Sequence, residues 1–280
     1  MIKKTDICAV ITTFQPNESL MANLLKINQQ VGCIIVVDDT GTILSENIYI
    51  NEIPNLIYIN NERNRGIAFS LNSGVQKAIE AGFQWVLTLD DDTVIDDDYL
   101  KQISLFYAKT EIDRIGLVSC SREGQHINDV QIKRNLITSG CIFNTKVFLE
   151  SGGFKEEMFI DLVDFDFCTR VRSSGYNLIQ LPFIGMQHKV GNSKVKSILG
   201  LSIIVYHHLP FRLYYQVRNP FLFFKYNYKS DFLLSGYLLL NPVKILMKAI
   251  LFEEQKLIRL KYIFKAFKDV ILSKVGKLDE

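Results

Sequence analysis

Short apolar runs alternate with amphipathic stretches through the first third of the chain. The apolar runs are rich in β-branched residues and predict strands over residues 7–12, 33–37, 56–59 and 85–89. The stretches 18–29 and 67–81 have the spacing of helices. Strands that are apolar on both faces and separated by helices indicate a parallel α/β sheet.

The pattern continues less regularly up to about residue 190. Residues 116–148 are strand-like, with turn signals at Glu123-Gly124 and Ser139-Gly140. An acidic helix start follows at residues 161–166, and Gly175 is placed to end that helix. Residues 176–181 then predict one last strand before Pro182.

Beyond residue 190 the composition changes. Residues 191–280 contain 15 Lys and Arg against 6 Asp and Glu, a net charge of +9, which leaves 17 against 24, or −7, for residues 1–190. Aromatic and basic segments at 198–206, 214–228 and 231–240 precede a helical pattern that starts near Pro242. Its apolar positions form a stripe: Leu257, Leu260, Phe264, Phe267, Ile271 and Val275. We therefore expect two domains, an α/β domain over 1–190 and a mostly helical extension over 191–280.

Residues 232–252 are the best candidate for a membrane-spanning helix. Asn241-Pro242, Lys244 and Lys248 interrupt them, so they fall short of the roughly 18 uninterrupted apolar residues that a span needs. No signal-peptide apolar region precedes the first strand, and the cysteines lack metal-ligand spacing. A cytoplasmic protein with buried thiols is expected. The basic region with its apolar stripe suits an anionic membrane surface, or packing on the first domain or a second subunit.

Three adjacent carboxylates, Asp90-Asp91-Asp92, follow the fourth predicted strand. They repel one another, and a divalent cation that prefers oxygen ligands, Mg²⁺ or Mn²⁺, is the usual compensation. Because residues i and i+2 of a strand point to the same side, Asp90 and Asp92 can share one site. A solvated acidic turn is the alternative. Ligands of open α/β sheets bind at the carboxyl ends of strands, so the position of the triplet favours the metal site.

Polar residues also follow the other strands. Asp38 and Asp39 can accept hydrogen bonds from a base or ribose, although Asp-Asp-Thr-Gly also suits a β-turn. Thr12 and Thr13 offer hydroxyls to the same nucleotide. Asn64-Arg65-Gly66 precedes a helix, where backbone N–H groups and a cation favour a diphosphate. The chain has no Walker loop and no GxGxxG fingerprint, so a P-loop ATPase and a dinucleotide oxidoreductase are not supported.

Asp161, Asp164 and Asp166 form a second acidic cluster at a predicted helix start. The helix dipole stabilises carboxylates there, which explains one or two of them. Group transfer to a hydroxyl needs a base that removes its proton, and an acid across the cleft from the triplet suits that role. His188 follows the last predicted strand and is a candidate metal ligand, although a lone histidine is more often structural.

These motifs resemble the family 2 glycosyltransferases of the GT-A fold over about residues 5–190. The matching segments are Thr12-Thr13, Val37-Asp38-Asp39-Thr40, Asn64-Arg65-Gly66, Leu89-Asp90-Asp91-Asp92 and residues 159–166. Within the family, residues 159–166 and Tyr214-Tyr215-Gln216-Val217-Arg218-Asn219 look most like bacterial rhamnosyltransferases that build O-antigen and capsular polysaccharides. The chain lacks the Glu-Asp base pair and the Gln-x-x-Arg-Trp motif of many members, which separates it from the processive synthases.

The resemblance implies a mixed, mainly parallel sheet flanked by helices, and an inverting single displacement. It implies that Asp38 or Asp39 holds the base and ribose, that Asp90 contacts the donor, and that Asp91 belongs to the same nucleotide-sugar site. Asp92, with Asp91 nearby, would bind the metal that bridges the diphosphate, and His188 would complete the metal shell.

On the acceptor side the resemblance implies that Asp164 is the general base. Asp161 and Asp166 are the alternatives for that role. Together with Arg218 they are also the candidate acceptor-side residues.

We therefore expect a metal-dependent hexosyltransferase that moves rhamnose from dTDP-rhamnose to a lipid-linked oligosaccharide at the inner face of the plasma membrane. Galactofuranosyl or another hexosyl transfer is the alternative. A sugar nucleotidyltransferase normally has a Gly-rich loop after its first strand, and residues 12–16 are not one. A non-catalytic subunit of this fold would have lost the triplet or the base. A second copy of the chain is a candidate partner, and nucleic acid is not.

Overall fold

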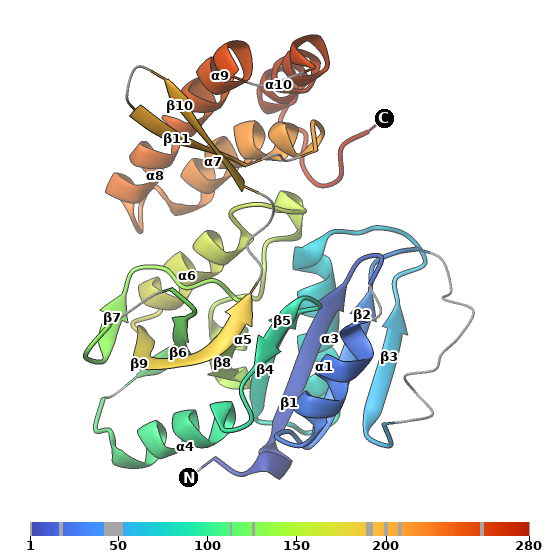
Figure 1. Cartoon of the computed structure of the whole chain (residues 1–280), viewed down its shortest axis with the longest axis vertical. Helices are drawn as coiled ribbons and strands as arrows, with labels where there is room; N and C mark the ends of the chain where they lie inside the picture. Colours follow the sequence, from blue (N-terminus) through green and yellow to red (C-terminus); the bar gives the residue numbers. More distant parts are fainter. Residues whose placement is uncertain are drawn as a thin grey trace. The chain divides into compact units, whose positions relative to one another are not determined.

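The computed structural model describes residues 2–16, 19–41, 53–112, 114–124, 127–188, 193–198, 201–206, 209–252 and 255–279. It divides the chain into two compact units, Met1–His188 and Lys189–Glu280 (Figure 1). Each unit has buried apolar residues of its own.

A mixed sheet forms the centre of the first unit. Its strands are β1 (Ile7–Thr13), β2 (Cys33–Asp38), β3 (Leu56–Asn60), β4 (Trp85–Asp90), β5 (Thr93–Ile95), β6 (Ile115–Arg122), β7 (Gln131–Lys133), β8 (Cys141–Asn144) and β9 (Asn177–His188). They lie in the order β3-β2-β1-β4-β8-β6-β9-β5, with β7 paired to β9. The long pairings β1–β2, β1–β4, β2–β3 and β6–β9 are parallel, and β8 runs antiparallel to β4 and β6. The predicted mixed, mainly parallel sheet is confirmed, and β1 to β4 begin at the predicted residues.

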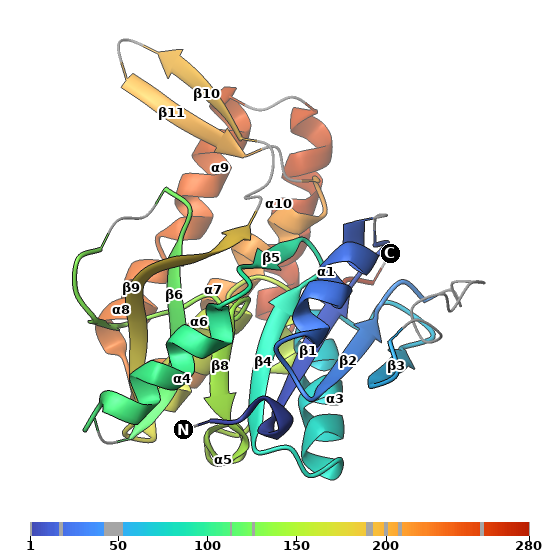
Figure 2. The same ribbon diagram turned by 60° about the horizontal axis from the view of Figure 1, so that its bottom comes forward.

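Helices cover both faces of this sheet (Figure 2). They are α1 (Ser19–Asn28), α3 (Ile67–Glu80), α4 (Tyr99–Lys109), α5 (Thr145–Glu150) and α6 (Val163–Ser173), with short 3-10 turns η1 (Lys4–Asp6) and η2 (Glu156–Met158). On one face, Leu24 of α1 and Ile103 of α4 join Ala9 of β1 in a single buried cluster. On the other face α3 approaches β1 so closely that a Cβ atom at Gly74 would lie 2.3 Å from Cγ1 of Val10. Both faces of β1 are therefore covered, which explains why the strand is apolar throughout.

Two segments differ from the predicted elements. Residues 145–148 were predicted as strand but begin α5, because the Asn144 side chain accepts a hydrogen bond of 3.0 Å from the Lys146 N–H and starts a helix. The last strand continues past Leu181 to His188. Pro182, which cannot donate to a ladder, lies where the β6–β9 register is irregular, between the pairs Cys120–Leu181 and Ser121–Ile184. The five cysteines are all buried thiols, as predicted.

The second unit contains a hairpin and helices. Its elements are β10 (Ser193–Ile198), β11 (Leu201–Tyr206), α7 (Arg212–Asn227), α8 (Phe232–Leu238), α9 (Asn241–Phe252) and α10 (Lys256–Ile271). The mostly helical character is confirmed, whereas the antiparallel β10–β11 hairpin was not predicted. On α10 the buried face contains Ile263 and Ala266, while Leu257, Phe264 and Ile271 of the predicted stripe are 84%, 63% and 82% exposed.

Arg218, which was expected on the acceptor side, is an internal residue of the second unit. It is completely buried on α7, with its guanidinium 5.0 Å from the ring centroids of Tyr214 and Tyr215. Its Nη1 donates a hydrogen bond of 2.6 Å to the carbonyl oxygen of Gly276, and Leu278 N–H donates one of 2.9 Å to the Tyr215 hydroxyl. The Tyr-Tyr-Gln-Val-Arg-Asn motif therefore fastens the segment that follows α10 to α7.

Replacing this arginine should destabilise the protein. Arg218→Met keeps most of the packing volume but leaves the Gly276 carbonyl without its charged donor, which costs about 1–3 kcal/mol of unfolding free energy. Urea denaturation followed by far-UV circular dichroism measures the loss. Lys261→Ala, at an exposed position of α10, is the control and should unfold like the wild type. Equal stability of Arg218→Met and the wild type would contradict the internal role.

Candidate functional site

The parallel register brings the predicted strand ends together. Thr12 of β1 lies opposite Asp90 of β4, and Thr13 lies opposite Asp38 of β2. Asp38 in turn pairs with Asn60 at the end of β3. The polar residues that the sequence places after separate strands therefore meet at one edge of the sheet.

Asp38 and Asp39 shape the loops at this edge. Asp38 is completely buried, and its carboxylate accepts hydrogen bonds from the Thr40 N–H at 2.8 Å and the Tyr58 hydroxyl at 2.5 Å. Asp39 accepts three hydrogen bonds of 2.8 Å each. One comes from the Asn61 side-chain amide, and the other two come from the backbone N–H groups of the two residues that directly precede α3. The chain bends at Thr40 and Gly41, and the Asp38 side chain supports this bend through the Thr40 N–H. Contacts of Asp38 or Asp39 with a nucleotide stay a prediction.

Those two backbone donors belong to Arg65 and Gly66, whose N–H groups were expected to bind a diphosphate. In this structure they donate to Asp39, and diphosphate binding at this position stays a prediction. What Arg65 presents to solvent is its exposed side chain, whose guanidinium lies 3.2 Å from the Phe69 ring centroid. Gly66 has φ +90°, and a Cβ atom there would lie 2.6 Å from Phe159, so the position requires glycine.

The middle residue of the triplet turns away from its neighbours. Oδ2 of Asp91 accepts hydrogen bonds from the Thr13 hydroxyl at 2.8 Å and from the Phe14 N–H at 3.4 Å. Burial raises the pKa of the Asp91 carboxyl, and these two hydrogen bonds oppose that rise. The Asp91 carboxylate therefore joins the end of β4 to the end of β1. This role in holding the strands together explains the residue without the donor contact that was expected.

Asp90 and Asp92 flank it and are each partly buried. The backbone of His188 lies beside them, because Thr93 and His188 are register partners in the β5–β9 pair. For His188 the structure describes the backbone and not the side chain. Within the described residues, no three His, Cys, Asp or Glu side chains are gathered in a group that could hold a metal ion.

The second acidic cluster follows a strained segment. Phe159, Asp161 and Leu162 all have φ between +62° and +66°, a region that non-glycine residues rarely adopt. The Ile160 N–H donates to the Met158 carbonyl oxygen at 2.8 Å, which closes a tight turn around Phe159. Strain of this kind persists where the surrounding structure imposes it, and it gathers at functional sites. Here it sets the direction from which α6 starts.

The three carboxylates of this cluster have different surroundings. Asp166 is completely buried and paired with Arg170, whose Nε lies 2.9 Å from its Oδ2. It is an internal residue of the first unit, and its acceptor-side role stays a prediction. Asp161 and Asp164 are partly buried, and Oδ1 of Asp164 accepts a hydrogen bond of 2.5 Å from the Thr138 hydroxyl.

Thr138 and Ser139 were not predicted as site residues. Besides the bond from Thr138 to Asp164, the Ser139 hydroxyl accepts a hydrogen bond of 2.9 Å from the Asp90 N–H. The two acidic clusters are therefore linked through one dipeptide. In the sequence only Ser139 stood out, as part of the Ser139-Gly140 turn signal, because hydrogen-bond partners so far away along the chain leave no local pattern.

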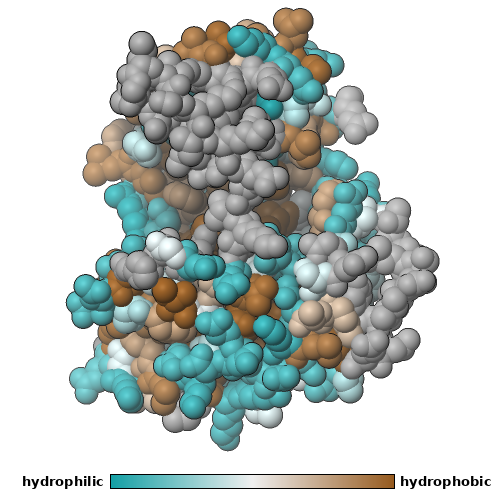
Figure 3. Space-filling model, viewed as in Figure 1, coloured by the Kyte–Doolittle hydropathy of each residue, from teal (hydrophilic) through white to brown (hydrophobic). Residues whose placement is uncertain are grey.

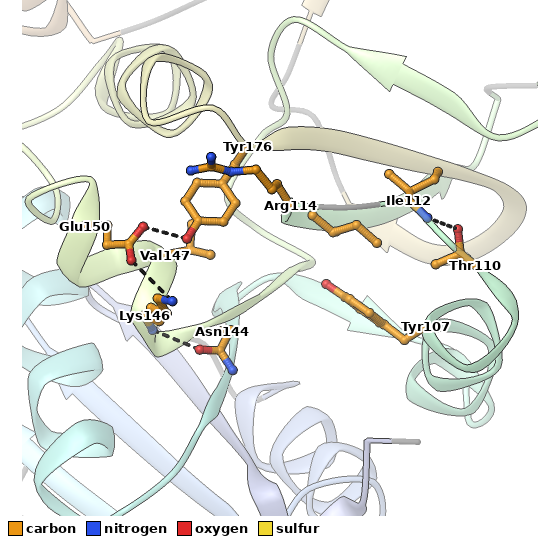
Figure 4. Close-up of a pocket in the computed structure, with 10 residues that line it drawn as sticks. Tyr107, Thr110, Ile112, Arg114, Asn144, Lys146, Val147, Glu150 and Tyr176 are labelled. Carbon is orange, nitrogen blue, oxygen red and sulfur yellow. Dashed lines mark hydrogen bonds and ion pairs between the residues drawn. The ribbon is translucent and has the colours of Figure 1, made fainter.

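A cavity of about 600 Å³ lies at the opposite edge of the sheet (Figure 4). Its lining includes Ile115 and Asn144, and Asn144 is the register partner of Trp85 at the start of β4. Tyr176 donates a hydrogen bond of 2.6 Å to Glu150, which also pairs with Lys146 at 3.6 Å. This cavity holds none of the residues predicted for the site and does not contribute to it.

Residues 8–169 match the family described as Glycosyl transferase family 2. The chain belongs to glycosyltransferase family 2. It is 30% identical over 245 residues to the dTDP-rhamnosyl transferase RfbF of Shigella flexneri, covering 80% of this chain and 81% of that relative. It is 32% identical over 83 residues to a poly-beta-1,6-N-acetyl-D-glucosamine synthase of Staphylococcus aureus, covering 29% of this chain and 19% of that relative.

Solved structures of TarS from S. aureus share the fold of this glycosyltransferase. The structure of TarS residues 1–349 superposes with a TM-score of 0.62 at 14% identity, covering 96% of this chain and 81% of that one. The same protein in complex with UDP-GlcNAc gives a TM-score of 0.53 at 12% identity, covering 98% and 93%. The expected GT-A fold is confirmed. The family match includes both acidic clusters, whereas His188 and Arg218 lie beyond it.

The Asp39 hydrogen bonds generate a test of its structural role. In Asp39→Asn one carboxylate oxygen becomes an amide that faces an N–H donor, so the unfolding free energy should fall by about 1–3 kcal/mol. Thermal and urea unfolding without ligand measure the loss, and Asp97→Asn, at an exposed carboxylate, is the matched control. An Asp39→Asn protein as stable as the wild type would show that the Asp39 carboxylate does not stabilise the start of α3.

Proposed function

We propose that this glycosyltransferase transfers rhamnose from dTDP-rhamnose, with inversion, to a hydroxyl of a growing, lipid-linked bacterial surface polysaccharide. The similarity to the dTDP-rhamnosyl transferase RfbF over most of both chains supports the donor. One structural observation carries the chemistry: Asp164, at the start of α6, is linked through Thr138-Ser139 to Asp90 at the end of β4. An acid suited to the acceptor and an acid suited to the donor thus belong to one site.

Asp164 is the proposed general base. It removes the proton from the acceptor hydroxyl as the hydroxyl oxygen forms a bond to C1 of the sugar. The bond from C1 to the diphosphate oxygen breaks on the opposite side, and the nucleoside diphosphate leaves with the electron pair. One displacement inverts the configuration at C1. Asp161 and Asp166 are the alternative bases, and the burial of Asp166 and its pairing with Arg170 favour the other two.

The residues at the end of β4 fit Mg²⁺ or Mn²⁺. Carboxylates are the oxygen ligands that these hard cations prefer, and Asp92 has His188 one register position away through Thr93. We assign Asp92 and His188 to the metal and Asp90 to the donor, with the exposed Arg65 side chain beside the diphosphate. When bound, the cation supplies charge that neutralises the leaving diphosphate.

Donor and metal assays test the function. We expect metal-dependent turnover of dTDP-rhamnose, lost with EDTA, and weak or no turnover of UDP-galactofuranose, UDP-galactose and UDP-GlcNAc. Asp164→Asn should bind the donor normally and lose about 10²–10⁴-fold in turnover, because the base is gone. Asp92→Asn should weaken metal-dependent donor binding, measured by calorimetry, and the exposed Asp97→Asn is the control for both.

Different outcomes reject different parts of the proposal. Preference for another nucleotide-sugar would reject rhamnose and keep the family reaction. No turnover or thermal stabilisation with any of these donors in the presence of Mn²⁺ or Mg²⁺ would reject the catalytic proposal. Full activity of Asp164→Asn would move the base to Asp161.

We also propose that the second unit binds the anionic cytoplasmic surface of the membrane. Apolar side chains are exposed on α8, α9 and α10, and α9 and α10 also carry lysines. Figure 3 shows hydrophobic and hydrophilic residues side by side on this unit. Phe232, Leu233, Met247 and Leu257 are 66%, 76%, 57% and 84% exposed. Residues 232–251 are long and apolar enough to cross a membrane, judged by length and composition alone. Only 22% of their most apolar stretch is buried, whereas the core helix of a soluble protein is mostly buried. These residues form two helices, α8 and α9, separated by a turn, which suits lying on the surface rather than crossing it.

Vesicle binding tests this surface. The protein should pellet with phosphatidylglycerol vesicles at low salt, and not with phosphatidylcholine vesicles, because the unit is basic. Replacing Leu257, Phe264 and Ile271 by serine should weaken binding by about tenfold or more. Serine at Ile132 and Leu149, which are 66% and 58% exposed in the first unit, is the control. Unchanged binding of the triple variant would reject the α10 face, and self-association without vesicles would identify a second copy as the partner.

A further inference from the structure

Residues 138–140 form a turn that is fastened to β4. The Gly140 N–H donates a hydrogen bond of 2.8 Å to the Thr88 carbonyl oxygen, and the Thr88 hydroxyl donates one of 2.6 Å to the Thr138 carbonyl oxygen. The Tyr99 hydroxyl also donates to the Gly140 carbonyl oxygen. Thr138 and Ser139 are each only 3% exposed. The backbone of the turn is thus held in place by the sheet and α4.

From this position Ser139 reaches both ends of the triplet segment. Its hydroxyl accepts a hydrogen bond of 2.9 Å from the Asp90 N–H and shares one of 2.7 Å with the hydroxyl of Thr93. Asp90 precedes and Thr93 follows the two remaining carboxylates of the triplet. One buried hydroxyl therefore closes the loop that carries the proposed donor and metal residues.

Thr138 makes the corresponding contact on the acceptor side. Its hydroxyl lies 2.5 Å from Oδ1 of Asp164, in the first turn of α6. The segment that leads into this helix has three residues at positive φ, so local backbone preference does not determine where α6 begins. The hydrogen bond from Thr138 in the turn therefore helps to fix the position of the Asp164 carboxylate.

We propose that Thr138 is the positioning residue for the general base. Ser139, its neighbour in the same turn, holds the loop of Asp90 and Asp92 in a fixed position relative to that base. The inference rests on the proposed function of Asp164 and Asp90. The turn between β7 and β8 then sets the distance between the group that takes the acceptor proton and the groups that hold the donor. In a displacement reaction that distance decides whether the acceptor oxygen is in line with C1, and a misplacement of about 1 Å can cost roughly 10²-fold in rate.

The hydrogen bond from Thr138 to Oδ1 of Asp164 also acts on the protonation of this carboxylate. The Thr138 hydroxyl keeps its own proton throughout. Because a donated hydrogen bond favours the ionised carboxylate, Thr138 keeps the base in its working form at lower pH.

Isosteric substitution tests the role of Thr138. Thr138→Val removes the hydroxyl and keeps the shape, so kcat should fall roughly 10- to 100-fold while the donor KM stays near the wild-type value. The acid limb of the pH–kcat profile should move to higher pH, which a purely structural residue would not cause. Thr138→Ser retains the hydroxyl and should restore both. Thr169→Val removes a buried hydroxyl from the same helix as Asp164 and is the matched control.

Ser139→Ala should produce the complementary phenotype. It leaves the Asp90 N–H without its acceptor, so the donor KM should rise roughly tenfold, with the acid limb of the pH profile unmoved. Thermal melts of each variant report folding. If Thr138→Val melts well below the wild type, the pair Thr138→Ser and Thr138→Ala, which differ by the hydroxyl alone, gives the same comparison.

A wild-type kcat and pH profile in Thr138→Val, or failure of Thr138→Ser to restore them, would overturn the inference. The failure of the proposed function looks different. In that case the wild-type protein turns over no nucleotide-sugar, or Asp164→Asn remains fully active, whatever the Thr138 variants do.

Discussion

The parallel pairing of β1 with β2 on one side and β4 on the other is the constraint on which the site depends. Both faces of β1 are buried, so a slip of one residue would exchange the side chains that face α1 for those that face α3. With the register held in this way, Thr12 lies beside Asp90 and Thr13 beside Asp38. The convergence of polar residues at one sheet edge follows from apolar packing at the centre of the sheet.

Hydrogen bonds from the protein compensate the repulsion among the acidic residues. Asp38, Asp39 and Asp91 accept bonds from hydroxyl and N–H donors of neighbouring segments, which gives them a structural role. Asp166 is neutralised by Arg170 within α6. Asp90, Asp92 and Asp164 are the acids to which the transfer chemistry is assigned. A site rich in carboxylates is stable here because most of them accept hydrogen bonds from the protein itself.

The second unit follows a different logic. Its buried interior includes an arginine, which is tolerated because two tyrosine rings and the Gly276 carbonyl oxygen surround the guanidinium. Its outer helices expose leucine, phenylalanine and methionine among lysines. Such a surface is costly in water and favourable at the boundary of an anionic bilayer, which connects this unit to a lipid-linked acceptor in the proposed function.

The sequence by itself determined strands β1 to β4 with helices α1 and α3 between them, the mainly parallel sheet and the acidic strand ends, because apolar periodicity and turn residues are local properties. It also placed Asp164 at the start of a helix. Only the tertiary structure decided which side chains the carboxylates contact, since the partner of Asp91 lies 78 residues away and that of Asp164 lies 26 residues away. The role of Thr138-Ser139 and the burial of Arg218 were equally out of reach. Hydrogen bonds between distant segments form only after the sheet has brought them together, and no local pattern records them.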